Sequence, residues 1–99
     1  IMIVDNNNFK SEVEDSKGFV FVDFYADWCG PCKMMSPIVD ELSKETDVKV
    51  VKINVDDSPE IAQKYGIMSI PTFIVFKDGK EYKKHIGMCE KDHLLELIK

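Results

Sequence analysis

The stretch "FVFVDFYA", residues 19–26, constrains the fold more than any other because it is apolar at almost every position. Successive side chains of a strand point to opposite faces, so a strand of this composition must be covered on both faces. Its β-branched and aromatic residues also favour a strand over a helix. The chain therefore has to place this segment inside a sheet that carries a layer of structure on each side.

The neighbouring segments can supply those layers. Apolar spacing typical of a helix runs over residues 31–45, and "VKVVKINVD", residues 48–56, is typical of another strand. A strand–helix–strand unit of this kind has parallel strands and a right-handed crossover. A short helix is also expected within residues 5–18, where asparagines precede a helical pattern and a glycine follows it.

The second half of the chain predicts one more helix, a hairpin and a final helix. Ser58, Pro59 and Gly66 have the positions of a helix cap, a first-turn proline and a stop. Residues 72–76 and 81–87 are separated by an Asp-Gly turn, and residues 90–99 form an amphipathic helical pattern. The predicted fold class is α/β, with a central mixed sheet flanked by helices. The chain has 99 residues, which fits a single domain over residues 1–99.

Composition excludes several classes of function. The net charge is −5 and all 13 basic residues are lysine, so affinity for nucleic acid phosphates is not expected. No apolar run is long enough to cross a bilayer, and the N-terminal residues lack the pattern of a signal peptide. Three cysteines do not suit a fully paired secreted scaffold, which favours a reducing, cytoplasmic location.

The most reactive candidate is the cysteine pair in "ADWCGPCK", residues 26–33, where the central strand ends and a helix begins. At a helix N-terminus the unpaired N–H groups and the dipole favour a thiolate, so Cys29 should have a lowered pKa and act as the nucleophile. Cys32 lies one turn further along the same face. We expect it to be more shielded and able to close a disulfide with Cys29. Pro31 suits the first turn, and Gly30 allows another backbone to approach.

Two other uses of the pair compete with redox chemistry. A purely structural disulfide over two intervening residues would remove little chain entropy, so it would stabilise the fold weakly. Alternatively, Cys29 and Cys32 could bind zinc together with Cys89 and His93. The two halves of that set are far apart along the chain, unlike those of compact zinc modules.

Asp23 is the one charged residue within the apolar run. Burial of a carboxylate is costly, so its pKa should be raised. Because the strand leads directly into the cysteine turn, Asp23 should lie below the pair, where it could accept the proton of Cys32. The alternative interpretation is an aspartate at a partly hydrated end of the sheet.

These residues together resemble the thioredoxin family. "VDFYADWCGPCK", "KINVDDSPEIAQKYGI" and "SIPTFIVFKDG" occur in that family's order and spacing, and the similarity covers nearly the whole chain. The resemblance implies the thioredoxin fold and disulfide reduction in other proteins. The Gly-Pro pair between the cysteines is similar to that of the reducing members.

The resemblance also implies roles for individual residues. Cys29 corresponds to the attacking thiolate, Cys32 to the resolving cysteine and Asp23 to the family's buried acid. Lys52 corresponds to a lysine whose side chain approaches that acid, although an ordinary exposed strand lysine is the alternative. Pro71 corresponds to the family's cis proline beside the cysteines.

The same resemblance implies a substrate groove and a reaction cycle. Trp28, Ile70 and Gly87 would form an apolar groove around Cys29, with the backbone of Ile70 pairing with an extended substrate. Cys29 would attack a target disulfide, and Cys32 would release the reduced target. Thioredoxin reductase would then recycle the monomeric protein, and no cofactor or metal of its own is expected. A binding module without turnover is the alternative function.

Four features depart from the family pattern or lie outside it. Tyr25 stands where many members have tryptophan, and Met68 and Ser69 stand where a basic residue or glycine is common, which predicts a more apolar groove. Cys89 belongs to no motif. It is either a packed thiol without function or a regulatory thiol whose oxidation would affect dimerisation or the groove.

Overall fold

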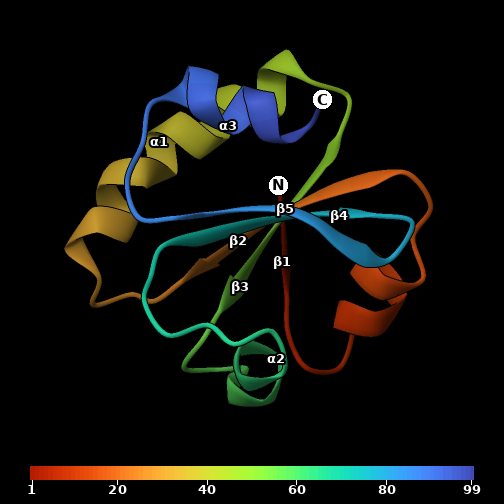
Figure 1. Cartoon of the computed structure of the whole chain (residues 1–99). Helices are drawn as coiled ribbons and strands as arrows, with labels where there is room; N and C mark the ends of the chain where they lie inside the picture. Colours follow the sequence, from red (N-terminus) through yellow and green to blue (C-terminus); the bar gives the residue numbers. More distant parts are fainter.

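The computed structural model describes all residues, 1–99, and contains a five-stranded mixed sheet (Figure 1). Its strands, in their spatial order, are β1 (Met2–Val4), β3 (Lys49–Asn54), β2 (Phe19–Tyr25), β4 (Thr72–Lys77) and β5 (Lys80–Ile86). The pairs β1–β3 and β3–β2 are parallel, whereas β2–β4 and β4–β5 are antiparallel. The predicted parallel unit and C-terminal hairpin are both confirmed.

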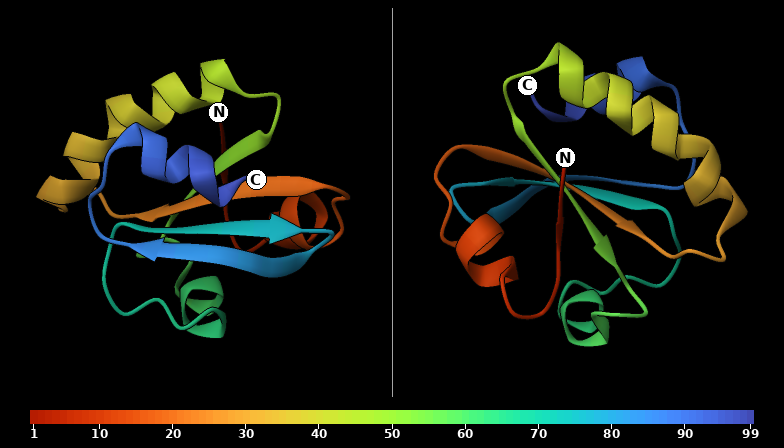
Figure 2. Two further views of the ribbon diagram at one scale, coloured as in Figure 1. Left: turned by 45° about the horizontal axis from the view of Figure 1, so that its top comes forward. Right: turned by 180° about the vertical axis from the view of Figure 1, so that it is seen from behind.

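Helices cover both faces of the sheet (Figures 1 and 2). The long helix α1 (Gly30–Glu45) and the C-terminal helix α3 (Lys91–Leu97) lie together on one face. The short π-helix η1 (Lys10–Glu14) and helix α2 (Pro59–Lys64) lie on the other. This arrangement is the layered α/β architecture that the doubly apolar strand requires.

Strand β2 is the centre of the fold, and its side chains divide between two cores. Val20, Val22 and Phe24 pack in the cluster beneath η1 and α2. Phe21 packs with α1 and α3 in the opposite cluster. Asp23 alternates with Phe21 along the strand, so it also points to the α1 side. The sequence pattern of the strand therefore reflects burial on both faces, and a carboxylate lies in the middle of one of them.

The hairpin between β4 and β5 has the predicted Asp-Gly turn, with both residues at positive φ (52° for Asp78 and 82° for Gly79). A Cβ atom on Gly79 would collide with the backbone carbonyl of Glu14, so a side chain is excluded there on two grounds. The carboxylate of Asp78 accepts a hydrogen bond of 2.7 Å from the backbone N–H of Gly18. The turn is thus fixed against the loop that leads into β2.

The sequence did not predict β1, and it predicted two helices that are longer than those in the structure. β1 has three residues and pairs only with β3, so it is too short to show a period of two. The helix expected within residues 5–18 is reduced mainly to the single π-turn of η1. The last helix spans Lys91–Leu97 rather than residues 90–99, because helix ends are set by local capping and packing.

Candidate active site

Cys29 caps the N-terminus of α1, as the sequence predicts. Its backbone is extended, and the N–H of Cys32 donates a hydrogen bond to its Sγ at 3.1 Å. Pro31 lies within the first turn, where a missing N–H costs no helical hydrogen bond. A sulfur atom in this position receives both a direct N–H donor and the positive end of a helix dipole.

Cys29 and Cys32 are joined in a disulfide, with Cα atoms 5.2 Å apart. Both residues are buried, Cys29 with 3% and Cys32 with 7% of its surface exposed. The expectation that Cys32 is the more shielded of the two is therefore wrong. The carbonyl oxygen of Ile70 lies 3.8 Å from the Cys29 sulfur and covers it, whereas Cys32 borders a cavity on the α1 side of the sheet.

Asp23 is buried, with 2% of its surface exposed, which excludes the alternative of a hydrated sheet end. Its Oδ1 atom has no hydrogen-bond partner. Burial raises the pKa of the Asp23 carboxyl to about 7, and the positive charge of Lys52 opposes part of that rise. The predicted rise in pKa is confirmed, and its cause is desolvation.

Lys52 is the direct neighbour of Asp23 across the β2–β3 pair, so both side chains emerge on the α1 side. The lysine is half-buried rather than exposed on the strand surface. Its Nζ atom forms no ion pair with Asp23. It lies instead 3.5 Å from Ser36 Oγ and 4.8 Å from the centre of the Tyr25 ring. The charge of Lys52 thus lowers the pKa of Asp23 through space, without a direct hydrogen bond between the two side chains.

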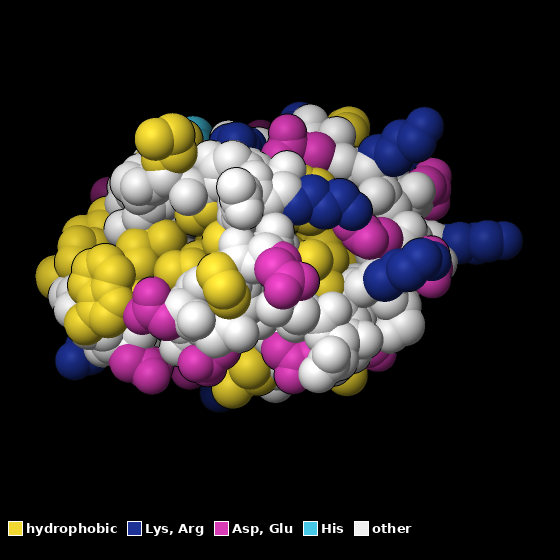
Figure 3. All heavy atoms as spheres, turned by 90° about the horizontal axis from the view of Figure 1, so that it is seen from below, with side chains coloured by type: hydrophobic (Ala, Val, Ile, Leu, Met, Phe, Trp, Pro, Cys, Tyr) yellow, Lys and Arg dark blue, Asp and Glu magenta, His cyan; other side chains and the backbone are white.

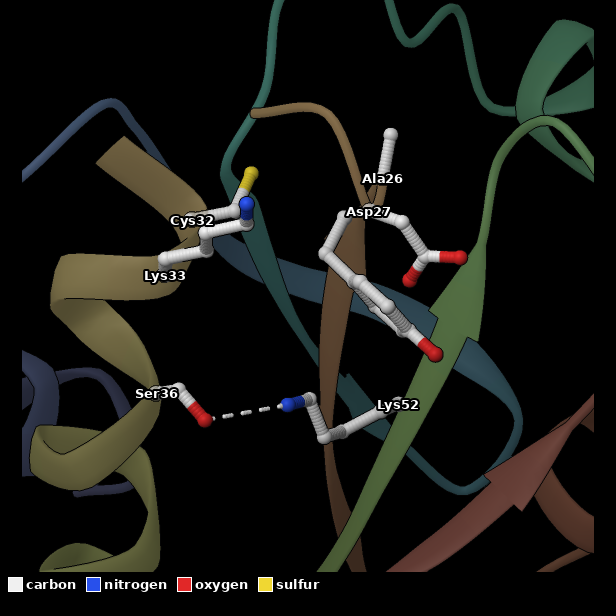
Figure 4. A pocket seen from close by; sticks show the side chains of 7 residues that line it. Ala26, Asp27, Cys32, Lys33, Ser36 and Lys52 are labelled. Carbon is white, nitrogen blue, oxygen red and sulfur yellow. Dashed lines mark hydrogen bonds between the residues drawn. The ribbon is translucent and has the colours of Figure 1, made fainter. Parts of the chain in front are cut away.

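We call the hollow on this side the back cavity (Figure 4). It has a volume of about 190 Å³ and is lined by Tyr25, Ala26, Asp27, Cys32, Lys33, Ser36 and Lys52. Figure 4 shows Ser36 of α1 and Lys52 of β3 pointing toward one another, with Cys32 higher on the same helix. Charged and hydroxyl side chains thus line the same cavity as Cys32.

A second, apolar hollow is lined by two residues that flank Cys29, Trp28 in the sequence and Ile70 in space, and we call it the front groove. It has a volume of about 350 Å³ and is lined by Trp28, Val55, Ile67, Met68, Ser69 and Ile70. Met68 is 95% exposed and Trp28 is 70% exposed, while the indole Nε1 of Trp28 donates a hydrogen bond of 2.7 Å to Asp56. Figure 3 shows hydrophobic side chains gathered at the left end of the molecule in this view, with several acidic side chains below and beside them.

The loop before β4 completes the front groove. The Ile70–Pro71 peptide bond is cis, as the family resemblance implies. The N–H of Ile70 donates no hydrogen bond within the protein. Gly87 is not among the residues that line the front groove, and its predicted part in a groove around Cys29 stays a prediction. It has φ of 93°, and its N–H donates a hydrogen bond of 2.8 Å to the carbonyl of Pro71. Gly87 is therefore tied directly to the proline loop.

The four residues of the alternative zinc site are not assembled. No group of three or more histidine, cysteine or acidic side chains is placed so that it could hold a metal ion. Cys89 packs against the core beneath α1 and α3, and burial raises the pKa of its thiol. His93 instead makes an edge-to-face contact with His85, with ring centres 4.5 Å apart.

Sequence reasoning missed several residues of the site. Val55 and Ile67 line the front groove, Asp56 holds the Trp28 indole, and Ser36 faces Lys52. Val55 and Asp56 directly follow β3, which runs parallel to β2. The carboxyl ends of parallel strands lie at the same edge of a sheet, so the sequence could have predicted that these residues lie near the cysteines that follow β2. Nothing in the sequence marked Ser36, because a serine on a helix is most often exposed.

A disulfide at the N-terminus of a helix, with an apolar groove nearby and a buried acid on the preceding strand, defines a thiol–disulfide oxidoreductase. The comparisons with known proteins place it within that class: the thioredoxin family model matches residues 1–99, and the chain belongs to the thioredoxin family.

Individual relatives agree with this assignment. A thioredoxin from Rickettsia felis is 50% identical over 97 residues, covering 96% of this chain and 92% of that protein. A thioredoxin from Chlamydia caviae is 46% identical over 99 residues, with 99% and 95% covered. Among solved structures, a mutant thioredoxin from Halobacterium salinarum has a TM-score of 0.90 at 38% identity, covering 98% of this chain and 86% of that one.

Membership of the family implies disulfide-containing targets and a reductase partner in general terms. None of the helices has the length and apolar character needed to span a membrane.

Proposed function

We propose that this protein reduces disulfides in other proteins, with Cys29 as the nucleophile and Cys32 as the resolving cysteine. The observation that carries this assignment is the N–H of Cys32 directed at the Cys29 sulfur at the start of α1. A negative charge on that sulfur is stabilised by the hydrogen bond and by the helix dipole, whereas nothing comparable faces Cys32.

The reaction proceeds by two exchanges. The Cys29 thiolate attacks one sulfur of the target disulfide, forming a mixed disulfide and expelling the other target sulfur as a thiolate, which takes up a proton. The Cys32 thiolate then attacks the Cys29 sulfur and expels the second target thiolate. Two electrons pass to the target, and the protein is left with the Cys29–Cys32 disulfide.

Asp23 is the proton acceptor for Cys32 in this proposal. Its carboxyl is buried on the α1 side, and a pKa of about 7 matches a group that must both accept and release a proton near neutral pH. Lys52 is the neighbour of Asp23 across the sheet, and its positive charge lowers the pKa of Asp23, which favours the ionised carboxylate that can accept a proton.

The front groove is the binding site for targets in this proposal. It lies beside Cys29, its lining is apolar except for Ser69, and the free N–H of Ile70 can pair with an extended peptide. Gly30 leaves open space above the cysteine turn, since nothing lies near the position of a Cβ there. Targets would therefore present an extended segment with apolar residues beside the disulfide.

We further infer that a thioredoxin reductase restores the dithiol and that the protein works as a monomer in the cytoplasm. The Gly-Pro pair between the cysteines and the odd number of cysteines support a reducing compartment. Membership of the thioredoxin family supports a reductase partner.

The test supplies NADPH, a bacterial thioredoxin reductase and a disulfide-bonded protein substrate, and follows NADPH consumption. Turnover is expected for the wild type and is expected to vanish in Cys29→Ser, with Cys89→Ser as the matched control that retains it. Turnover that survives in Cys29→Ser contradicts the proposed nucleophile. Absence of turnover in the wild type would favour the alternative of a binding module.

A further inference from the structure

The ammonium group of Lys52 is held inside the back cavity by two groups that the proposed reaction does not use. Ser36 Oγ, on the second turn of α1, lies 3.5 Å from Lys52 Nζ and can accept its hydrogen bond (Figure 4). The Tyr25 ring lies beneath the same ammonium, with Nζ 4.8 Å from the ring centre, within the range of a cation–π contact. Lys52 is therefore anchored between a helix and a strand.

The place of this ammonium matters because Asp23 has so little else to stabilise its charge. The carboxyl is buried, and its Oδ1 lacks any hydrogen-bond partner. Lys52 is the one positive charge that acts on the Asp23 carboxyl, and it does so without an ion pair. Coulomb interactions in a partly buried site change steeply over a few ångströms, so the effect depends on where the ammonium is held.

A lysine without such anchors would leave the cavity. Its ammonium is strongly hydrated and sits on a flexible four-carbon stem, so water is the favoured surrounding when no protein acceptor is present. The back cavity is open to solvent at its rim, where exposed Asp27 and Lys33 contribute to the lining. Removal of the Ser36 hydroxyl would therefore allow the ammonium to move outward, away from Asp23.

We propose that Ser36 is a positioning residue that, with the Tyr25 ring, keeps the Lys52 ammonium within the back cavity and so sets the pH at which Asp23 accepts the proton of Cys32. This inference rests on the proposed role of Asp23. The proton passes from the Cys32 thiol to the Asp23 carboxylate, and Ser36 neither donates nor accepts it. Ser36 acts only through Lys52.

Other charged groups near Asp23 do not replace this contact. The titratable side chains around the back cavity are Tyr25 and Asp27 from the end of β2, Cys32 and Lys33 from α1, and Lys52 from β3. Opposite Asp23, β4 places the uncharged Phe73. Burial, followed by the nearby Asp27, raises the pKa of the Tyr25 phenol, which therefore stays neutral beneath the ammonium. Lys33 is exposed on the helix, so its charge is screened by water.

The test measures the rate at which Cys32 releases a reporter thiol from a preformed mixed disulfide on Cys29, as a function of pH. In Ser36→Ala, the pH midpoint of release should rise by roughly half a unit, with the rate well above the midpoint unchanged. Ser36→Thr keeps a hydroxyl and should keep the wild-type midpoint. Lys52→Met should raise the midpoint further, and Ser36→Ala should add nothing in that background.

Two outcomes would overturn the inference: a midpoint in Ser36→Ala equal to that of the wild type, or a shift that persists when Lys52 is methionine. Asp23→Asn separates this failure from that of the proposed function. If Asp23→Asn abolishes the midpoint while Ser36→Ala leaves it unchanged, the role of Asp23 stands and that of Ser36 falls. If the midpoint survives in Asp23→Asn, the proton acceptor is another group and both assignments fall. Denaturant unfolding of each variant confirms that it is folded.

Discussion

The two hollows near the Cys29–Cys32 disulfide differ in chemistry, and only the back cavity is lined by one of the two cysteines. The front groove is apolar, with Met68 and Trp28 largely exposed to solvent. The back cavity is smaller and polar, with Lys52 and Ser36 facing one another. This difference in chemistry fits the proposed function, in which targets bind at the front groove and the proton of Cys32 passes to Asp23 on the α1 side of the sheet.

The largest effect on turnover should come from removal of Cys32, the cysteine that lines the back cavity. Cys32→Ala leaves the attack by Cys29 intact but provides no thiolate to release the target, so the mixed disulfide should accumulate and catalytic turnover should be lost. Mass spectrometry of the trapped species measures this directly. Cys89→Ala should trap nothing, and a Cys32→Ala protein that still turns over would contradict the division between the two cysteines.

The next effect is on stability, and it tests the buried carboxyl of Asp23, the neighbour of Lys52 across the sheet. Asp23 has a pKa of about 7 in the folded protein against an ordinary value of 3.8, so the folded state binds the proton more tightly. The contribution of Asp23 to the free energy of unfolding should therefore be largest below about pH 4 and should fall as the pH rises toward 7. The full difference corresponds to roughly 4 kcal/mol.

Asp23→Asn should remove that penalty. The variant should be more stable than the wild type at pH 8 by a few kcal/mol and nearly equal to it at pH 4, while its release of mixed disulfide is slower. Urea unfolding at the two pH values measures the first effect. Equal stability gains at both pH values would show that the asparagine acts through packing rather than through charge.

The front groove should respond more weakly, and in binding rather than in chemistry. Met68→Ser removes an exposed apolar wall, so the KM for a protein target should rise by about fivefold, which corresponds to about 1 kcal/mol, with kcat unchanged. Met34→Ser is the matched control, because Met34 is also an exposed methionine (63%) but does not line the front groove. A loss of kcat in Met68→Ser would place this residue in the chemical step instead.

Substitution of Cys89 should give the smallest effect, because this residue lines neither the front groove nor the back cavity. Its thiol packs against the core, and burial raises its pKa, so little thiolate is available for oxidation. Cys89→Ser is expected to leave both turnover and peroxide-induced dimer formation unchanged. Loss of a peroxide-dependent dimer in this variant would instead support a regulatory thiol.

Much of the fold could be predicted because its strongest element is also its most distinctive in sequence. The run of apolar residues in β2 is possible only in a strand with a layer on each face, and the Asp-Gly turn fixes the hairpin. β1 escaped prediction because three residues on the edge of a sheet carry no periodic signal. The contraction of η1 and α3 reflects packing and capping, which a single sequence records poorly.

By itself, the sequence determined the chemistry of the site: the two cysteines, their place at a helix start and the buried acid behind them follow from local spacing and from the cost of burying charge. Only the tertiary structure decided which residues from distant segments lie next to Cys29 and which line the cavity next to Cys32. The carbonyl of Ile70 lies against the Cys29 sulfur, the N–H of Gly87 donates a hydrogen bond to Pro71, and Ser36 of α1 contacts Lys52 of β3. These contacts join segments distant in the chain, and side-chain direction across such distances depends on how the layers pack.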